Sequence, residues 1–189
     1  KKMLVLDLDN TLWGGVIGDS GQQGIEIGHE TGIAEGYHEF QQYIKDHKQL
    51  GVLLSVNSKN DHENAIEGLN HPDTVLTPDD FISIKANWNT KDHNIEDISD
   101  EISILPDSFV FVDDNPAERN IVSAQIKGIA VPEMNSVENY IRTLDRNAYF
   151  ELTSYTTDDI KRNEMYKANI ERIRNEKAFT NYSEYLLSL

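Results

Sequence analysis

The stretch "MLVLDLDNTLWGG", residues 3–15, decides the fold. It is apolar from Met3 to Leu8 except for Asp7, and Asp9 follows, which is typical of a buried strand that ends in two carboxylates. Side chains alternate faces along an extended chain, so we expect Asp7 and Asp9 to point the same way. Two like charges held close together are unfavourable unless a cation compensates them. The stretch therefore predicts a strand whose end carries a charged site.

The composition narrows the class of protein. With 189 residues, 38% of them hydrophobic and 26% charged, the chain can form one domain with a substantial core. A formal net charge of −16 argues against nucleic acid and against an anionic membrane as partners. No cysteine is present, which excludes disulfides, thiolate catalysis and cysteine-based zinc sites. No apolar stretch approaches the ~18 residues of a membrane helix, and no signal-peptide segment is visible, so we expect a cytoplasmic globular domain.

Further apolar runs alternate with helical patterns along the chain. They are "GVLLSVNS" (51–58), "FISIKAN" (81–87) and "SFVFVDD" (108–114), with "GIAVP" (128–132) as a candidate fifth. Short apolar runs separated by amphipathic segments are typical of buried parallel strands in βαβ units. The sequence therefore predicts an α/β fold with a parallel sheet. In such sheets ligands bind outside the carboxyl ends of the strands.

Polar residues follow three of these predicted strands. The first strand ends in Asp7 and Asp9 with Thr11 beyond, the second in Asn57, Ser58, Lys59 and Asn60, and the fourth in Asp113 and Asp114. After the last of these, "NPAER" (115–119) predicts a helix with Asn115 as N-cap, Pro116 at the first position and Glu118 closing a capping box. Asp113 and Asp114 are thus expected at a strand-to-helix corner.

The remaining segments suggest how the domain is organised. Six glycines between residues 13 and 28 predict turns, and we expect a small β-hairpin flap at about 13–30 with no large cap domain. An amphipathic helix is predicted from about Ala34 to Leu50. We expect residues 1–150 to form the catalytic domain and 151–189 a helical extension, with a polar helix from Thr156 to about Lys177. Because Met occurs only at position 3 near the start, we expect a segment of a longer multidomain protein.

Four aspartates at one sheet edge would repel each other unless a cation binds there. Mg²⁺ prefers carboxylate and water oxygens and commonly serves phosphate chemistry, so we expect it near Asp7, Asp113 and Asp114. A carboxylate beside a metal-bound phosphate can attack phosphorus and form an aspartyl-phosphate. The second carboxylate, two residues on, can protonate the leaving oxygen and later activate water. Asp7 is therefore the predicted nucleophile and Asp9 the predicted general acid and base.

Phosphoryl transfer also needs donors and positive charge around the phosphate oxygens. Ser58 is a candidate donor. Lys91 begins the predicted helix "TKDHNIEDI" (90–98), where a lysine opposes the helix dipole at a cost of ~0.3–1 kcal/mol, a placement that makes sense beside an anion. Lys59 and Lys85 compete for the same role.

Each of these motifs also has a purely structural interpretation. Ser58 alone is more often a cap, Lys91 a solvated lysine, and the paired aspartates a favourable charge at a helix N-terminus. Trp13 is more typical of a packing residue than of a substrate platform. None of the six histidines has metal-ligand spacing. The functional interpretation is favoured because the order of the motifs and their strand-end positions all agree.

These residues resemble the haloacid dehalogenase superfamily of phosphotransferases. Its four motifs are similar to "DLDNT" (7–11), Ser58, Lys91 and "VDD" (112–114), and the runs "LDLDNTLWGGVIGDSGQQGI", "SKND", "NWNTKDHNI", "FVFVDDNPAER" and "YFELTSYTTDDIKRNEMY" resemble the FkbH-like branch. The resemblance implies a Rossmann-like three-layer α/β/α sandwich with the first, second and fourth strands adjacent. It also implies Mg²⁺ held by the Asp7 carboxylate, the Asp9 backbone carbonyl and Asp113, in an open site.

The function expected from these observations is a Mg²⁺-dependent phosphatase of small phosphorylated metabolites, either phosphosugars or phosphorylated acids. Residues expected to contact the substrate are Thr11, Trp13, Lys59, Asn60 and Arg119. Some FkbH-like proteins load a glyceryl unit onto an acyl carrier protein through a cysteine, so a transferase would here need a thiol from the carrier or a neighbouring domain. More remote alternatives are a phospho-accepting signalling module and a non-catalytic interaction domain.

Overall fold

The computed structural model describes residues 1–150, 164–175, 177 and 187. It contains one parallel sheet of four strands in the order β3-β2-β1-β4. The strands are β1 (Met3–Leu6), β2 (Leu53–Lys59), β3 (Ser83–Asn87) and β4 (Phe109–Val112). The central strand β1 pairs on both sides, with Leu4 opposite Leu54 of β2 and Val110 of β4. The predicted α/β class and the adjacency of the first, second and fourth strands are confirmed.

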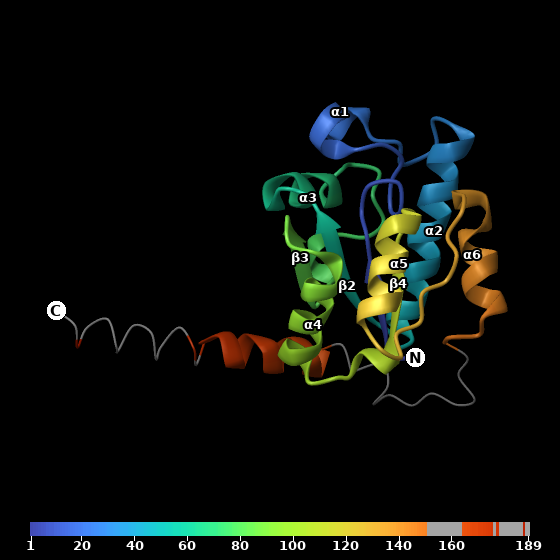
Figure 1. Ribbon diagram of the computed structural model, residues 1–189. Coiled ribbons are helices and arrows are strands. Elements are labelled where there is room, and N and C mark those ends of the chain that lie inside the picture. Colours follow the sequence, from blue (N-terminus) through green and yellow to red (C-terminus); the bar gives the residue numbers. More distant parts are fainter. Residues whose placement is uncertain (151–163, 176, 178–186, 188–189) are drawn as a thin grey trace.

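Helices cover both faces of the sheet and make a three-layer sandwich (Figure 1). Helices α2 and α6 pack together on one face, and α4 and α5 pack together on the other. The short helices α1 and α3 lie side by side near the carboxyl ends of the strands. The bounds are α1 (Ile17–Gly24), α2 (Gly32–Gln49), α3 (His62–Leu69), α4 (Lys91–Ile102), α5 (Pro116–Gln125) and α6 (Val137–Arg146), with 3₁₀ turns η1 (Pro78–Asp80) and η2 (Pro106–Ser108).

The alternation of side chains along β1 divides the core into two clusters. Leu4 and Leu6 pack with residues of α2 and α6, whereas Met3 and Val5 pack with residues of α4 and α5. All four side chains are fully buried, and each such large aliphatic side chain contributes about 1.5–3 kcal/mol. Because both faces are covered, the strand is apolar throughout and does not alternate with polar residues. This packing fixes the strand end that carries Asp7.

The insert after β1 differs from the expected β-hairpin, and that prediction is wrong. Residues 17–24 form helix α1, kinked at Gly21, whose φ is 70°. A single antiparallel bridge closes the base of the insert, with Gly14 and Glu26 exchanging backbone hydrogen bonds of 3.0 and 2.8 Å. The physical reason is a bond from eight residues earlier: the Asp9 carboxylate accepts from the free N–H of Ile17 and so favours a helix start there. No large cap is present in the described residues, as expected.

The candidate fifth strand at 128–132 is only a single parallel bridge between Ala130 and Val110 of β4. Two hydrogen bonds make it, from Phe111 N to Ala130 O at 2.8 Å and from Ala130 N to Phe109 O at 3.1 Å. Pro132 follows two residues later and has no N–H to continue the ladder.

The predicted helix at 34–50 corresponds to α2, which Thr31 caps by accepting from Ala34 N at 3.0 Å.

Residues 164–175 are helical, while the rest of the predicted helix from residue 156 lies largely outside the described residues. Ile170 is buried in the core cluster of α4 and α5, and Met165 is exposed.

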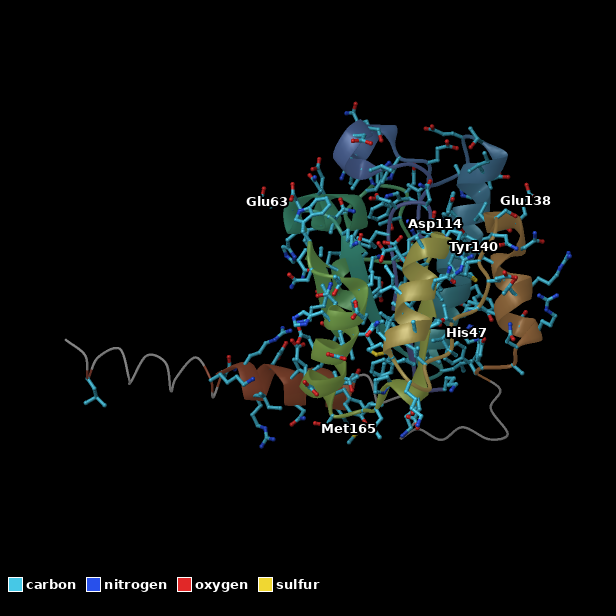
Figure 2. All side chains as sticks on the ribbon, viewed as in Figure 1. His47, Glu63, Asp114, Glu138, Tyr140 and Met165 are labelled. Carbon is cyan, nitrogen blue, oxygen red and sulfur yellow. The ribbon has the colours of Figure 1, made fainter. Side chains whose placement is uncertain are left out.

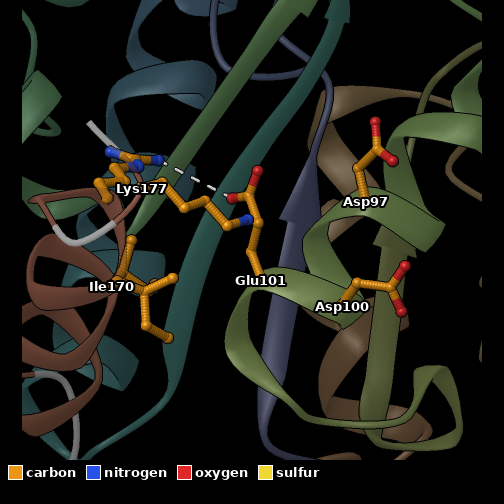
Figure 3. A pocket seen from close by; sticks show the side chains of 7 residues that line it. Asp97, Asp100, Glu101, Ile170 and Lys177 are labelled. Atoms are coloured by element: carbon orange, nitrogen blue, oxygen red, sulfur yellow. Dashed lines mark ion pairs between the residues drawn. The ribbon is translucent and has the colours of Figure 1, made fainter. Parts of the chain in front are cut away.

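A cavity of about 320 Å³ lies between residues 164–177 and the end of α4, where Arg174 pairs with Glu101 at 3.8 Å (Figure 3). It is roughly 15 Å along α4 from Lys91 and so belongs to another part of the molecule. Within the described part of the chain, no helix combines the length and apolarity that a membrane span requires.

Candidate active site

The candidate site lies where β1 and β4 end and where α4 and α5 begin. The backbone N–H of Asp7 donates to the Val112 carbonyl at 2.9 Å, which extends the pairing of the two strands by one residue. Asp113 follows β4 directly, and Asn115 caps α5 through a 2.9 Å bond from Ala117 N. The predicted N-cap is confirmed. Glu118 instead bonds Lys59 at 2.8 Å, and no capping box is formed at α5.

Lys91 provides the positive charge between the carboxylates. Its Nζ donates to Asp7 Oδ1 and to Asp113 Oδ2, each at 3.0 Å, and to the Asn57 carbonyl at 2.8 Å. The side chain is only 2% exposed. Burial acts to lower the pKa of Lys91, but the adjacent carboxylates of Asp7 and Asp113 outweigh it and hold that pKa above its usual value. The lysine is therefore charged and bound to the predicted nucleophile.

A network of asparagines holds Lys91 in place. Asn57 Nδ2 donates to the Lys91 carbonyl at 2.9 Å, and Asn94 Nδ2 donates to Asn57 Oδ1 at 3.0 Å. Asn94 is not among the residues predicted from the sequence, although its spacing of three residues from Lys91 puts both on one helix face. Of the competing lysines, Lys85 pairs with Glu101 and Lys59 with Glu118. Lys91 is thus the lysine that lies beside Asp7.

Three carboxylates form a cluster with the donor set that Mg²⁺ prefers. Oxygens of Asp7, Asp113 and Asp114 lie within 4.8 Å of one another. Burial, followed by the nearby Asp7 charge, raises the pKa of Asp113 to about 6 and that of Asp114 to about 7. Thr11 Oγ1 lies 3.5 Å from Asp7 Oδ2 and 3.3 Å from Asp114 Oδ1. Three carboxylates this close repel one another, and their oxygens form a donor set that fits a divalent cation such as Mg²⁺.

Asp9 lines the same cavity as Asp7, but donors around the insert bind its carboxylate. Oδ1 accepts from Trp13 Nε1 and from Ile17 N, both at 3.0 Å, and Oδ2 accepts from Asn60 Nδ2 at 2.8 Å. Burial raises the pKa of Asp9 even though these three bonds act in the opposite direction. A carboxyl with a raised pKa more readily holds a proton, as a general acid must.

Ser58 is buried at the end of β2, where its Oγ accepts from Asn60 Nδ2 at 3.1 Å. That bond leaves the Ser58 proton to be donated.

Trp13 is fully buried, and a Cβ added to Gly68 would lie 2.4 Å from its ring. Trp13 therefore packs under α3 and does not line the cavity. Its role in substrate binding stays a prediction that these contacts do not support.

Arg119 also takes a structural position. Its Nη1 donates to the backbone carbonyls of Asp113 at 3.0 Å, Asp114 at 2.9 Å and Met134 at 3.4 Å. The residue is 8% exposed and does not line the cavity. These bonds fix the backbone that carries the two aspartates. Contact between Arg119 and a substrate likewise stays a prediction.

The cavity in front of the carboxylates has a volume of about 210 Å³. Of the predicted residues, Thr11, Ser58 and Asn60 do not line it. The lining consists of Asp7, Asp9, Lys59, Lys91, Asp113 and Asp114, together with Asn10, Asn115 and Glu118. Asn10 adopts a left-handed conformation with φ of 55°, which asparagine tolerates better than most residues, and its carbonyl accepts from Tyr140 Oη at 2.8 Å. Figure 2 labels Tyr140 and Asp114, which lie near the carboxyl ends of the strands.

Comparison with known proteins gives a match among solved structures. No protein-family model matches the chain, and no curated protein matches it. A crystal structure of the N-terminal part of the protein BF1531 from Bacteroides fragilis, containing a phosphatase domain and complexed with Mg, is similar with a TM-score of 0.80 and 43% sequence identity. The match covers 82% of this chain and 42% of that one, so this chain spans less than half of the solved relative.

Proposed function

We propose that this chain is a Mg²⁺-dependent phosphatase that hydrolyses phosphate monoesters through an aspartyl-phosphate on Asp7. The observation that carries the proposal is the placement of Asp7 between the buried Lys91 ammonium and the carboxylates of Asp113 and Asp114, facing a polar cavity. The similarity to a solved structure described as containing a phosphatase domain complexed with Mg supports it. Membership of the haloacid dehalogenase superfamily, and of its FkbH-like branch, is part of the proposal.

The proposed hydrolysis proceeds in two steps, formation of the aspartyl-phosphate on Asp7 and its hydrolysis by water. In the first, an Asp7 oxygen attacks phosphorus, the bond from phosphorus to the ester oxygen breaks, and Asp9 gives that oxygen a proton. In the second, Asp9 takes a proton from water, whose oxygen attacks phosphorus and releases phosphate and the Asp7 carboxylate. The raised pKa of Asp9 suits the first step. The Ser58 hydroxyl would donate to a phosphate oxygen, and the Lys91 ammonium, whose N–H groups bond Asp7, Asp113 and Asn57, would contribute its positive charge.

Carboxylates of Asp7, Asp113 and Asp114 would hold the cation, together with the Asp9 backbone carbonyl that the family resemblance implies. When bound, Mg²⁺ supplies positive charge that neutralises the cluster and attracts phosphate oxygens. Lys91 supplies a second positive charge and holds the Asp7 carboxylate in position through its 3.0 Å bond. Thr11, which lies within 3.5 Å of both Asp7 and Asp114, helps to orient these two carboxylates.

The proposed substrates are small phosphorylated metabolites. The cavity of about 210 Å³ has room for a phosphate and a small leaving group. We place the catalytic domain at residues 1–150, since all the site residues lie between Asp7 and Arg119. A neighbouring domain and an acyl carrier protein remain proposed partners of the longer protein.

Phosphate release from sugar phosphates, phosphoglycerates and p-nitrophenyl phosphate tests the proposal. We expect turnover in Mg²⁺, loss of turnover in EDTA, and loss in Asp7→Asn. Asp100→Asn is the matched control, because Asp100 is an exposed aspartate near the far end of α4, and we expect it to keep full activity. Turnover that survives Asp7→Asn would rule out the aspartyl-phosphate. No turnover of any compound by folded protein in Mg²⁺ would reject the phosphatase.

A further inference from the structure

The charges around the cavity bear on which substrates fit it: phosphosugars, whose leaving group is uncharged, or phosphorylated acids, whose leaving group carries a carboxylate. Resting on the proposed phosphatase function, we infer that the leaving group is a small uncharged alcohol carrying further hydroxyl groups. We also infer that Glu118 selects it against leaving groups that carry a carboxylate. The inference rests on how the cations near the cavity are already paired, on an unpaired oxygen of Glu118, and on the neutral amides that complete the lining.

Every cation that the structure describes near the cavity already has a partner. Lys91 bonds Asp7 and Asp113, and Lys59 bonds Glu118 at 2.8 Å. The guanidinium of Arg119 faces backbone carbonyls and does not line the cavity. A second anionic group on the substrate would therefore meet a cavity wall with no uncommitted positive charge in the described residues. Desolvating such a group without a partner is unfavourable.

Glu118 adds a specific acceptor to this wall. It lies in the first turn of α5, whose start is fixed by the Asn115 cap and Pro116. One of its oxygens, Oε1, accepts from Lys59, while Oε2 is enclosed and has no hydrogen-bond partner among the described residues. A buried carboxylate oxygen without a donor is unfavourable. A hydroxyl group on the substrate supplies a donor when the Lys59 and Glu118 side chains adjust to it.

A substrate carboxylate would have the opposite effect. It could bind Lys59 only by displacing Glu118, and Glu118 would then be left with both oxygens unpaired in a place where its side chain is 14% exposed. The like charges of the two carboxylates would add repulsion. The pair of Lys59 and Glu118 therefore admits a hydroxyl donor and opposes a carboxylate.

Two asparagines complete a lining suited to hydroxyl groups. Asn10 Oδ1 accepts from Gly15 N at 2.8 Å, and Asn115 Oδ1 accepts from Ala117 N at 2.9 Å. Each oxygen is thus engaged, and the amide NH₂ groups are the donors left to bind a hydroxyl oxygen. No apolar side chain of the described residues lines the cavity, so a hydrophobic leaving group would gain little there.

The test uses substrate pairs that differ only in one group. Glycerol 3-phosphate is compared with 3-phosphoglycerate, and erythritol 4-phosphate with 4-phosphoerythronate, so that a CH₂OH replaces a carboxylate. We expect kcat/KM in Mg²⁺ to favour the alcohol of each pair by roughly tenfold or more. Glu118→Gln removes the opposing charge and frees Lys59, so the preference should fall to about threefold or less. Glu138→Gln, an exposed glutamate in the first turn of α6, is the matched control and should keep the wild-type ratio.

Binding measured without turnover separates this inference from the phosphatase proposal. Calorimetry of the same pairs on Asp7→Asn should show the same preference for the alcohol. An equal or reversed preference in either measurement, or a ratio that Glu118→Gln leaves unchanged, would overturn the role of Glu118. Absence of turnover for all four compounds and for p-nitrophenyl phosphate would instead reject the phosphatase, while the binding ratio would still decide on selectivity.

Discussion

Replacing Lys91 with methionine tests whether this lysine is the internal counter-charge of the acidic cluster. The change keeps an unbranched stem of similar length and removes the ammonium. In the wild type that ammonium lies 3.0 Å from Asp7 Oδ1, 3.0 Å from Asp113 Oδ2 and 2.8 Å from the Asn57 carbonyl. The variant would leave two buried carboxylates and one buried carbonyl without this partner.

The magnitude follows from the geometry. At 3.0 Å and an effective dielectric constant of about 20, each ion pair is worth about 5–6 kcal/mol of Coulomb energy before the cost of desolvating the charges is subtracted. Breaking a buried pair by removing one partner typically costs about 3–5 kcal/mol, because the remaining charge stays buried. We expect Lys91→Met to lower the free energy of unfolding by that amount in the absence of metal.

Lys85→Met is the matched control. Lys85 also pairs with one glutamate, Glu101, but their side chains are 19% and 30% exposed. Such a pair is partly screened by solvent, and we expect its loss to cost about 0–1 kcal/mol. Urea denaturation followed by the fluorescence of the buried Trp13 measures both variants, in EDTA and in Mg²⁺.

Mg²⁺ should stabilise Lys91→Met more than it stabilises the wild type, because in the variant no ammonium competes with the cation for the carboxylates. The midpoint of unfolding should therefore shift further on adding Mg²⁺ to that variant than to Lys85→Met. Equal costs for the two substitutions, or equal stabilisation by Mg²⁺, would refute the assignment of Lys91 as counter-charge.

Three further predictions concern the wild-type protein and two positions outside the cluster. Mg²⁺ at a hundred times its Kd should stabilise the wild type by about 2.7 kcal/mol and raise the unfolding temperature by about 5–10 °C in scanning fluorimetry, and no shift would argue against a metal site. Asp80 bonds Lys45 and Lys48. Burial acts to raise the pKa of Asp80, but the Thr77 N–H and the two lysines outweigh burial and hold this pKa below its usual 3.8. Its stabilisation is therefore present above about pH 4 and lost as the pH falls through the lowered pKa, so Asp80→Asn should cost about 1–3 kcal/mol at pH 7 in urea titrations and progressively less below pH 4. In Gly68→Ala the new Cβ would lie 2.4 Å from the Trp13 ring, and this overpacking, about 1–3 kcal/mol, should outweigh the helix propensity gained and lower the urea midpoint.

The parts of the site that the sequence predicts are those set by strand ends. Asp7 and Asp113 lie at the ends of apolar runs that are typical of buried strands, and parallel strands bring their carboxyl ends to one edge. The position of Lys91 at a helix start was predictable from the helical pattern of residues 90–98. What periodicity cannot supply is the partner of each side chain, since partners come from segments distant in the sequence.

The insert and Arg119 illustrate this limit. Glycines in the insert indicate turns equally well for a hairpin and for a short helix, and the deciding interaction is the bond from Ile17 N to Asp9 eight residues earlier. An arginine in the first turn of a helix is ordinarily solvated, yet Arg119 is buried because it satisfies carbonyls of Asp113 and Asp114 that lack strand partners. Neither outcome is encoded in a local pattern.

The net negative charge of the chain and the few cations at the cavity both bear on substrate specificity. A protein with a net charge of −16 repels anions at long range, so a phosphate ester is attracted only by charges inside the cavity. Those charges are few: Lys91 is bound to two carboxylates and Lys59 to a third. The proposed Mg²⁺ at Asp7, Asp113 and Asp114 would then be the charge that neutralises the phosphate. A site built in this way can accept one dianionic group and has nothing left for another. We therefore expect the number of negative charges on the metabolite to govern substrate choice in this chain, and its shape to matter only after that.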